Sequence, residues 1–205
     1  MARRQLLRSV LAVGVGVGLG LGLVGFQAGA AQADERGSVA IMFSESVVPQ
    51  LFKAGVFMYG AESVEVSMGN SGALSASYPL TGDSTSRPTT SISVDGEVGG
   101  ISFYNGPAEA TAGLGSLVVR RTGRTGTVTG KLIGPFSMES GQFAKTMTVF
   151  TISGATARRT SSGWQMQGTL TLTADAASTL NTLLKTTVFT ASAPIGEISA
   201  QVQSR

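Results

Sequence analysis

Residues Trp164-Gln-Met-Gln-Gly-Thr-Leu-Thr-Leu-Thr173 decide the fold, because apolar and polar residues alternate along the stretch. A period of two places Trp164, Met166 and the two leucines on one face of an extended chain. Glutamines and threonines fall on the opposite face, and β-branched threonine suits the solvated side of a sheet. The stretch therefore predicts a β-strand that is buried on one face only.

The same alternation recurs upstream and marks further strands. It runs through residues 39–43, 64–68, 74–80, 92–94 and 101–103. Turn sequences separate the strands, namely Asn105-Gly106-Pro107, Thr122–Gly126 and Ser161-Ser162-Gly163. The polar segment Thr81–Thr90 is interpreted as a longer loop. We predict a single all-β domain, sandwich-like or barrel-like, with roughly ten short antiparallel strands and two short helices.

Two segments have the pattern of short helices. Ser46–Ala54 begins at a residue that can cap a helix, carries Pro49 in its first turn and is followed by Gly55. Ala174–Leu184 follows Thr173, another capping residue, and repeats its apolar residues at helical spacing. We therefore predict a helix in each segment.

The first 33 residues have the three parts of an export signal. Three arginines form a basic region, an apolar stretch runs from Val10 to Phe26, and Ala31-Gln32-Ala33 has the pattern of a cleavage site. We predict that residues 1–33 are a signal peptide and that residues 34–205 form the secreted β domain. The pair Arg3-Arg4 leaves two export routes open, general secretion and the twin-arginine route.

The charge of the expected mature domain is balanced. The chain has 15 basic and 12 acidic residues, and three of the basic residues lie in residues 1–33. A neutral domain gives no support for nucleic-acid binding, and cleavage removes the apolar stretch, so no stable membrane insertion is expected afterwards. We expect the product to be secreted into the extracellular space or loosely associated with the cell wall. The sequence leaves its oligomeric state open.

The chain contains no cysteine and no histidine, which excludes several chemistries. Disulfides, nucleophiles activated by histidine, and zinc sites of imidazole and thiolate all need these residues. A hydrolase would have to use carboxylates alone. The candidate pairs are Glu62 with Glu65, Asp95 with Glu97, and Glu45 with Glu139. A polar strand edge explains such carboxylates without catalysis, so we predict that the protein is not an enzyme and keep the carboxylate-only hydrolase as an alternative.

Several segments occur in a recognisable order. They are Ser77-Tyr-Pro-Leu-Thr-Gly82, Asp95-Gly-Glu-Val-Gly-Gly-Ile-Ser-Phe103 and Leu170-Thr-Leu-Thr-Ala-Asp-Ala-Ala-Ser-Thr-Leu-Asn181, with Phe189 and Pro194-Ile-Gly196 after them. In these segments the chain resembles the HtaA-type domain of actinobacterial exported proteins, and the last run looks like that family's closing strand, helix and final strand. Because well-characterised members bind haem through a tyrosine with histidines nearby, the resemblance implies haem as a ligand.

The sequence departs from that family at the residues that would support a ligand. It has no histidine, and Tyr104-Asn105-Gly106 stands where the family has a segment of the glycine–histidine type. Tyrosine is then the main remaining side chain that can ligate ferric haem. Tyr78 alternates with expected core residues, whereas Tyr104 precedes a turn and Tyr59 follows an apolar run. We take Tyr104 as the first candidate ligand and Tyr59 as the second, with a packing role as the alternative for each.

Basic residues gather around the turn Thr122–Gly126. They are Arg120, Arg121, Arg124 and Lys131. Guanidinium groups bind oxyanions through two hydrogen bonds, so these arginines are candidates for holding an anionic cell-wall polymer or the carboxylates of haem. The alternative is a charged hairpin tip that keeps a strand edge soluble.

These features predict an exported, non-catalytic binding or structural module at the cell surface or in the extracellular space. A haem-binding domain with a tyrosine ligand is the alternative. The partner would be a cell-wall polymer or a small planar ligand. The residues specify no metal site, and haem is the one cofactor that the resemblance suggests.

Overall fold

The computed structural model describes residues 37–61, 64–86, 89–94, 100–137 and 141–203. In this part of the chain there are eleven strands and two helices. The strands are β1 (Gly37–Phe43), β2 (Val56–Gly60), β3 (Glu65–Met68), β4 (Leu74–Ser86), β5 (Thr89–Val94), β6 (Gly100–Asn105), β7 (Ala110–Thr122), β8 (Thr125–Ser137), β9 (Gly141–Thr160), β10 (Gly163–Leu172) and β11 (Pro194–Gln203). The helices are α1 (Val48–Lys53) and α2 (Ala174–Leu184).

The expected signal peptide, residues 1–33, lies outside the described residues, so it stays a prediction. None of the helices in the described ranges has the length and apolar character that crossing a membrane requires.

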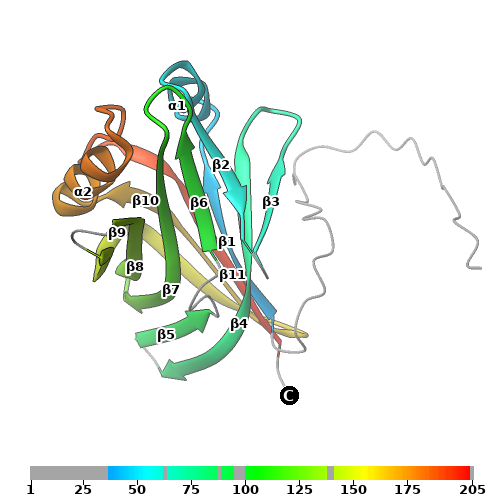
Figure 1. The fold of residues 1–205 in the computed structure, drawn as a ribbon. Coiled ribbons are helices and arrows are strands. Elements are labelled where there is room, and N and C mark those ends of the chain that lie inside the picture. The colour runs from blue at the N-terminus through cyan, green and yellow to red at the C-terminus, as the bar shows by residue number, and fades with distance from the viewer. Residues whose placement is uncertain (1–36, 62–63, 87–88, 95–99, 138–140, 204–205) are drawn as a thin grey trace, which may run out of the picture.

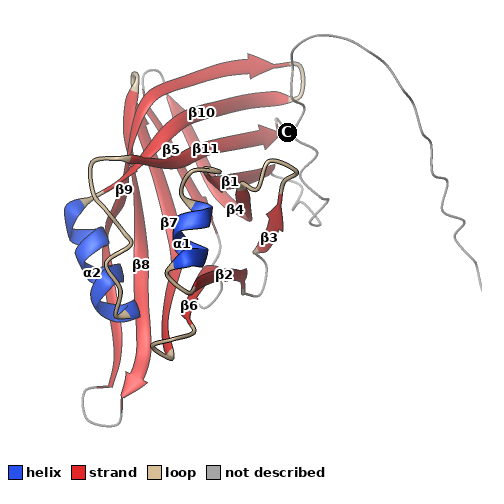
Figure 2. Ribbon diagram, turned by 90° about the horizontal axis from the view of Figure 1, so that it is seen from above, coloured by secondary structure: helices blue, strands red, loops and turns tan. Residues whose placement is uncertain are grey.

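Eight of the strands close into an antiparallel barrel (Figure 1). Their order is β7-β5-β4-β1-β11-β10-β9-β8, and β8 pairs with β7 to complete the circle. Strands make up most of the described structure, and the two helices are short (Figure 2). Of the two architectures that the sequence left open, the structure has the barrel and not the sandwich. The strands are longer than expected, up to 20 residues in β9, because strands of a barrel run around the axis as well as along it.

Three extra strands widen one sector of the barrel wall. The first half of β7, Ala110–Gly115, pairs with β6, whereas Val118–Thr122 pairs with β5. β4 is divided in the same way, because its first residues pair with β3 and its later residues pair with β5. β2 then pairs with the free edge of β6. The wall therefore consists of β5 towards one end of the barrel and of β6, β2 and β3 towards the other.

The inside of the barrel is filled by apolar side chains. Along β10, Met166, Leu170 and Leu172 are buried, as the alternation predicted. Residues from other strands complete this core, among them Val39, Ile41, Tyr78, Leu80, Ile92, Leu114, Val119, Val128, Leu132, Phe150 and Ile198. A barrel of eight strands is just wide enough to be filled by its own side chains. A ligand site is therefore to be sought on the surface and at the two ends.

The helix α2 begins and ends where the sequence predicted. Thr173 caps it, because its Oγ1 accepts a hydrogen bond of 3.2 Å from the Ala176 amide. Ala177, Leu180 and Leu184 are buried. The helix packs against β6, β7 and β9, so its apolar side covers one end of the barrel.

The helix α1 was predicted with the wrong cap. It starts at Val48 after Val47, which makes no capping hydrogen bond through its side chain. Ser46 lies before the helix, and its hydroxyl contacts the Ser44 hydroxyl at 2.9 Å. Pro49 is in the first turn as expected, where a missing amide hydrogen costs nothing.

The segment Thr81–Thr90 is not the loop that its composition suggested. The strand β4 continues through Ser86, and β5 begins at Thr89, so the two form a paired hairpin. Serine and threonine favour turns in short clusters, but a run of them also pairs as strands when neighbouring strands supply the partners. The other expected turns, after Asn105, Thr122 and Thr160, fall between strands as predicted.

Candidate functional site

The two candidate tyrosines lie on the outer surface of neighbouring strands. Tyr59 is on β2 and Tyr104 on β6, and their exposed fractions are 48% and 38%. Phe57 is the direct cross-strand partner of Tyr104, so both side chains project from the same face. Tyr59 lies opposite Ser102, which makes it a diagonal neighbour of Tyr104. The structure therefore brings the two predicted ligand candidates together.

Two phenylalanines extend this surface. Phe57 is 48% exposed and Phe52, from α1, is 37% exposed. Their ring centroids are 5.7 Å apart. Gly106 lies beside both the Tyr104 and the Phe57 rings, because a Cβ on it would be 3.8 Å and 3.9 Å from them. We call Phe52, Phe57, Tyr59 and Tyr104 the aromatic face.

The aromatic face is held in place by the turn before β2 and the turn after β6. The Gly106 amide donates a hydrogen bond of 3.0 Å to the Gly55 carbonyl. Gly55 has a φ of 74°, a conformation that glycine adopts without strain. A Cβ at this position would also lie 2.5 Å from the Pro107 ring. The close approach of these turns brings α1, with Phe52, against β2.

Sequence reasoning missed Phe52 and Phe57. The segment Val56–Met58 is apolar at every position, so no alternation shows which side chains face outwards. Val56 is buried, whereas Phe57 is exposed. Only the pairing of β2 with β6 assigns Phe57 to the outer face.

The arginines are not part of this surface. Thr111 pairs with Tyr104, and Arg120 is nine residues further along β7. At about 3.3 Å per residue, these positions are roughly 30 Å apart. Arg121 and Arg124 follow at the same tip, whereas Lys131 lies back along β8, opposite Gly115. One haem bound to Tyr104 therefore cannot also reach Arg120, Arg121 and Arg124.

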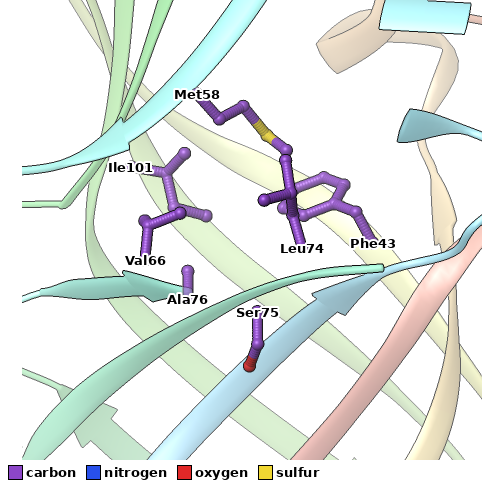
Figure 3. A pocket seen from close by; sticks show the side chains of 7 residues that line it. All are labelled: Phe43, Met58, Val66, Leu74, Ser75, Ala76 and Ile101. Atoms are coloured by element: carbon purple, nitrogen blue, oxygen red, sulfur yellow. The ribbon is translucent and has the colours of Figure 1, made fainter. Parts of the chain in front are cut away.

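A small crevice lies in the wall between β2 and β3, which each pair with a different neighbour (Figure 3). Its apolar side chains converge on one another, whereas the Ser75 hydroxyl points away. They are Phe43, Met58, Val66, Leu74, Ala76 and Ile101. The empty space is about 150 Å³ and too narrow for a water molecule. Sites for small molecules usually have roughly 300–1,000 Å³, so this crevice is part of the packed wall.

Tyr78 is a core residue, as the sequence predicted. Its side chain is fully buried, and its hydroxyl has no hydrogen-bond partner at good geometry. Burial raises the pKa of Tyr78 well above its ordinary value, and the Ile101 backbone offsets this only in part. Tyr78 therefore stays a neutral phenol and is no candidate ligand.

The hydrolase that the sequence left as an alternative would need paired carboxylates, and the structure describes only two of the candidates. Glu62, Asp95, Glu97 and Glu139 lie outside the described residues, and the two that remain, Glu45 and Glu65, are exposed. Among the described residues, no group of three metal-binding side chains comes together.

Comparison with solved structures identifies the fold. The C-terminal domain of HtaA from Corynebacterium glutamicum matches with a TM-score of 0.58 and 12% identity, over 82% of this chain and 99% of that one. The heme binding protein HtaB from the same organism matches with a TM-score of 0.55 and 12% identity, over 83% and 93%. The N-terminal domain of HtaA matches with a TM-score of 0.53 and 16% identity, over 84% and 99%.

The chain therefore has the fold of the HtaA-type domain, as the sequence resemblance predicted. No protein-family model and no curated protein matches the sequence. Identities this low establish the shared fold alone.

Proposed function

We propose that this HtaA-type fold serves as a non-catalytic binding module that takes a flat, apolar ligand on its aromatic face. The observation that carries the proposal is the cross-strand pair of Phe57 and Tyr104, both exposed, with the Phe52 ring beside Phe57 at an interplanar angle of 33°. The similarity to HtaB, described as a heme binding protein, supports a ligand of this kind.

Exposed aromatic side chains in contact with one another favour a ligand. Large apolar side chains scattered singly on a surface are ordinary, but contiguous apolar patches mark interaction sites. Aromatic rings prefer offset or edge-to-face partners, which a planar molecule with its own π-system supplies. The aromatic face offers four such rings within two strands and one helix.

Ferric haem is the planar ligand that these residues fit best. The chain has neither histidine nor cysteine, so phenol oxygens are the strongest iron donors it can offer. Tyr104 lies opposite Phe57 and diagonal to Tyr59 on the aromatic face. Lys53 follows Phe52 on α1 and is exposed, so its ammonium group can pair with a carboxylate of the ligand. A bound haem supplies a Lewis-acidic iron and a planar macrocycle. Phe57 and Phe52 would hold the macrocycle, and Tyr104 would hold the iron.

A ligand bound to the aromatic face would stay partly exposed to solvent. The crevice between β2 and β3 is too small for a macrocycle, and the barrel core is filled. An open site loses less water from the ligand than an enclosed one, so we expect micromolar rather than nanomolar affinity.

A comparison of two porphyrins tests the stacking surface. The purified protein is titrated with ferric haem and with metal-free protoporphyrin, and binding is followed by absorbance. Phe57→Ser should weaken both porphyrins about tenfold, because both rely on ring contacts. Phe143, an exposed phenylalanine on β9, supplies the matched control Phe143→Ser, which should leave both affinities unchanged. Equal weakening by the two variants, or no saturable binding at micromolar porphyrin, would show that the aromatic face is not the site.

We further propose that the module acts outside the cytoplasmic membrane after loss of residues 1–33. The basic region, the apolar stretch and the Ala31-Gln32-Ala33 site support this. Sequencing the N-terminus of the protein from culture medium should give Asp34 as the first residue. Recovery of the full chain from the membrane fraction would contradict export as a released domain.

A further inference from the structure

The chain contains a single Asn-Gly dipeptide, Asn105-Gly106, where β6 ends and a turn begins. Asparagine is chemically labile. It loses its side-chain amide fastest when glycine follows, because glycine has no Cβ to keep its amide nitrogen away from the asparagine side chain. The two other asparagines, Asn70 and Asn181, precede serine and threonine. The sequence alone therefore makes Asn105 the asparagine that deamidates most readily.

Deamidation sets two requirements on this dipeptide. The Gly106 nitrogen attacks the side-chain carbonyl carbon of Asn105, the new C–N bond closes a succinimide ring, and the bond from that carbon to Nδ2 breaks. Ammonia leaves with the proton that the Gly106 amide has lost. Water then opens the ring to aspartate or to isoaspartate, in which the main chain runs through the former side chain. The reaction therefore needs a free Gly106 amide and an Asn105 side chain that can turn towards it.

The fold holds both of these groups on other partners. The Gly106 amide donates a hydrogen bond of 3.0 Å to the Gly55 carbonyl, and Asn105 Nδ2 donates one of 2.7 Å to the Leu184 carbonyl. Asn105 is buried, and its backbone lies between β2 on one side and β7 on the other. The attack thus requires both hydrogen bonds to break and the end of β6 to separate from α2.

The product does not fit the place that Asn105 occupies. Oδ1 of Asn105 is buried and has no hydrogen-bond partner among the described residues, whereas Nδ2 satisfies the Leu184 carbonyl. An aspartate has no N–H group for that carbonyl, and its charge would be buried without a donor. Isoaspartate in addition lengthens the main chain by a carbon atom, directly after Tyr104. The junction of β6 with α2 therefore cannot close again around the modified residue as it was.

We propose that Asn105-Gly106 is a latent deamidation site, which the fold seals and which local opening of the junction between β6 and α2 releases. Folded proteins open locally at a free energy below that of global unfolding. The rate of modification in the folded state is then the rate of the unfolded chain multiplied by the open fraction. Because the reaction is irreversible, each opening carries a chance of permanent damage to the end of β6. The site does not depend on the ligand proposed for the aromatic face.

Asn70 supplies an internal reference for the rate. It lies in the exposed turn between β3 and β4, and Ser71 follows it. The protein is incubated at mildly alkaline pH in heavy-oxygen water, both folded and unfolded in guanidinium chloride, and peptide mass spectrometry measures deamidation at both asparagines. In the unfolded chain Asn105 should react about tenfold faster than Asn70, because glycine follows it. In the folded protein the order should reverse, because only Asn105 is sealed.

Two results of this comparison would overturn the proposal. If Asn105 reacts faster than Asn70 in the folded protein, the fold does not seal the site. If Asn105 stays unmodified in the unfolded chain while Asn70 reacts, the dipeptide is not a deamidation site.

Gly55→Ala tests the contact that holds the Gly106 amide. The added Cβ would lie 2.5 Å from the Pro107 ring, so the turn that carries the Gly55 carbonyl has to move. Gly123→Ala is the matched control, because Gly123 also has a positive φ, 62°, but a Cβ there meets nothing within 4 Å. In the folded state, Asn105 should deamidate about tenfold faster in Gly55→Ala than in the parent chain and at the parent rate in Gly123→Ala.

Equal rates at Asn105 in the two folded variants would show that the Gly55 carbonyl does not seal the site. If Gly55→Ala does not fold, the comparison of Asn105 with Asn70 in the parent chain decides the proposal by itself.

Discussion

Asn105 Nδ2 donates a hydrogen bond of 2.7 Å to the Leu184 carbonyl, and this bond joins the end of β6 to the last turn of α2. Asn105 is buried, with 3% of its surface exposed. The neighbouring residue, Tyr104, points to the opposite side of the strand. The interior contact of Asn105 therefore fixes the strand end that carries the proposed ligand residue.

Loss of this bond should cost stability. Asn105→Ala leaves the Leu184 carbonyl without its partner, and we expect the free energy of unfolding to fall by about 1–3 kcal/mol. Urea denaturation followed by circular dichroism measures the change. Gln50→Ala removes an exposed bond of 2.9 Å to the Ser46 carbonyl and serves as the control. A loss as large for Gln50→Ala as for Asn105→Ala would contradict the role given to the buried bond.

Gly196 should tolerate no side chain. It lies in β11 between Phe43 of β1 and Leu170 of β10. A Cβ at this position would overlap the Met42 backbone carbonyl, which cannot move without opening the sheet. We expect Gly196→Ala to cost more than about 3 kcal/mol or to prevent folding.

The control for this substitution is Gly69→Ala, because the nearest atom to a Cβ there is the Ala73 carbonyl oxygen at an ordinary 3.7 Å. Yield of folded protein and urea midpoints compare the two variants. A Gly196→Ala protein as stable as the parent chain would refute the close packing of β1 against β11.

Tyr78 should make the fold sensitive to alkaline pH. Because burial raises the pKa of Tyr78 in the folded protein, the folded state keeps a proton that the unfolded chain releases above pH ~10. The stability from this group is thus fully present below pH ~10 and is lost as the pH rises further. Tyr78→Phe removes both the ionisation and the unpartnered hydroxyl. We expect a stability at neutral pH equal to or above that of the parent, and a smaller fall above pH ~10. If the free energy of unfolding of Tyr78→Phe falls as steeply with alkaline pH as that of the parent chain, the role given to Tyr78 is wrong.

Local features of the sequence were sufficient to predict α2. Thr173 supplies the cap, Leu180 and Leu184 repeat at helical spacing, and both signals lie within the helix itself. Alternation likewise predicted the buried face of β10. The same alternation occurs in sandwiches and barrels, so closure was not predictable. It depends on the pairing of β7 with β8 and on the path of the β4–β5 hairpin, which are set by distant partners.

The candidate site was predictable only in part. The sequence indicated that Tyr104 is exposed, because a turn follows it. The sequence did not predict the aromatic face, because Phe52 and Phe57 meet only after α1 docks on β2. Arg120 is close to Tyr104 in sequence, but β7 carries the two to opposite ends of the barrel. Sequence separation says little about distance when an extended strand lies between two residues.

The axial ligand of bound ferric haem tests the central claim most directly. Resonance Raman and absorbance spectra are recorded for the haem complexes of the parent chain, Tyr104→Phe and Tyr59→Phe. The account predicts a tyrosinate-to-iron charge-transfer band in the parent chain and in Tyr59→Phe, and its loss in Tyr104→Phe. Metal-free protoporphyrin should still bind Tyr104→Phe, because the phenylalanine ring keeps the stacking surface. A band that persists in Tyr104→Phe, or a parent chain without a saturable Soret shift at micromolar haem, would contradict the account.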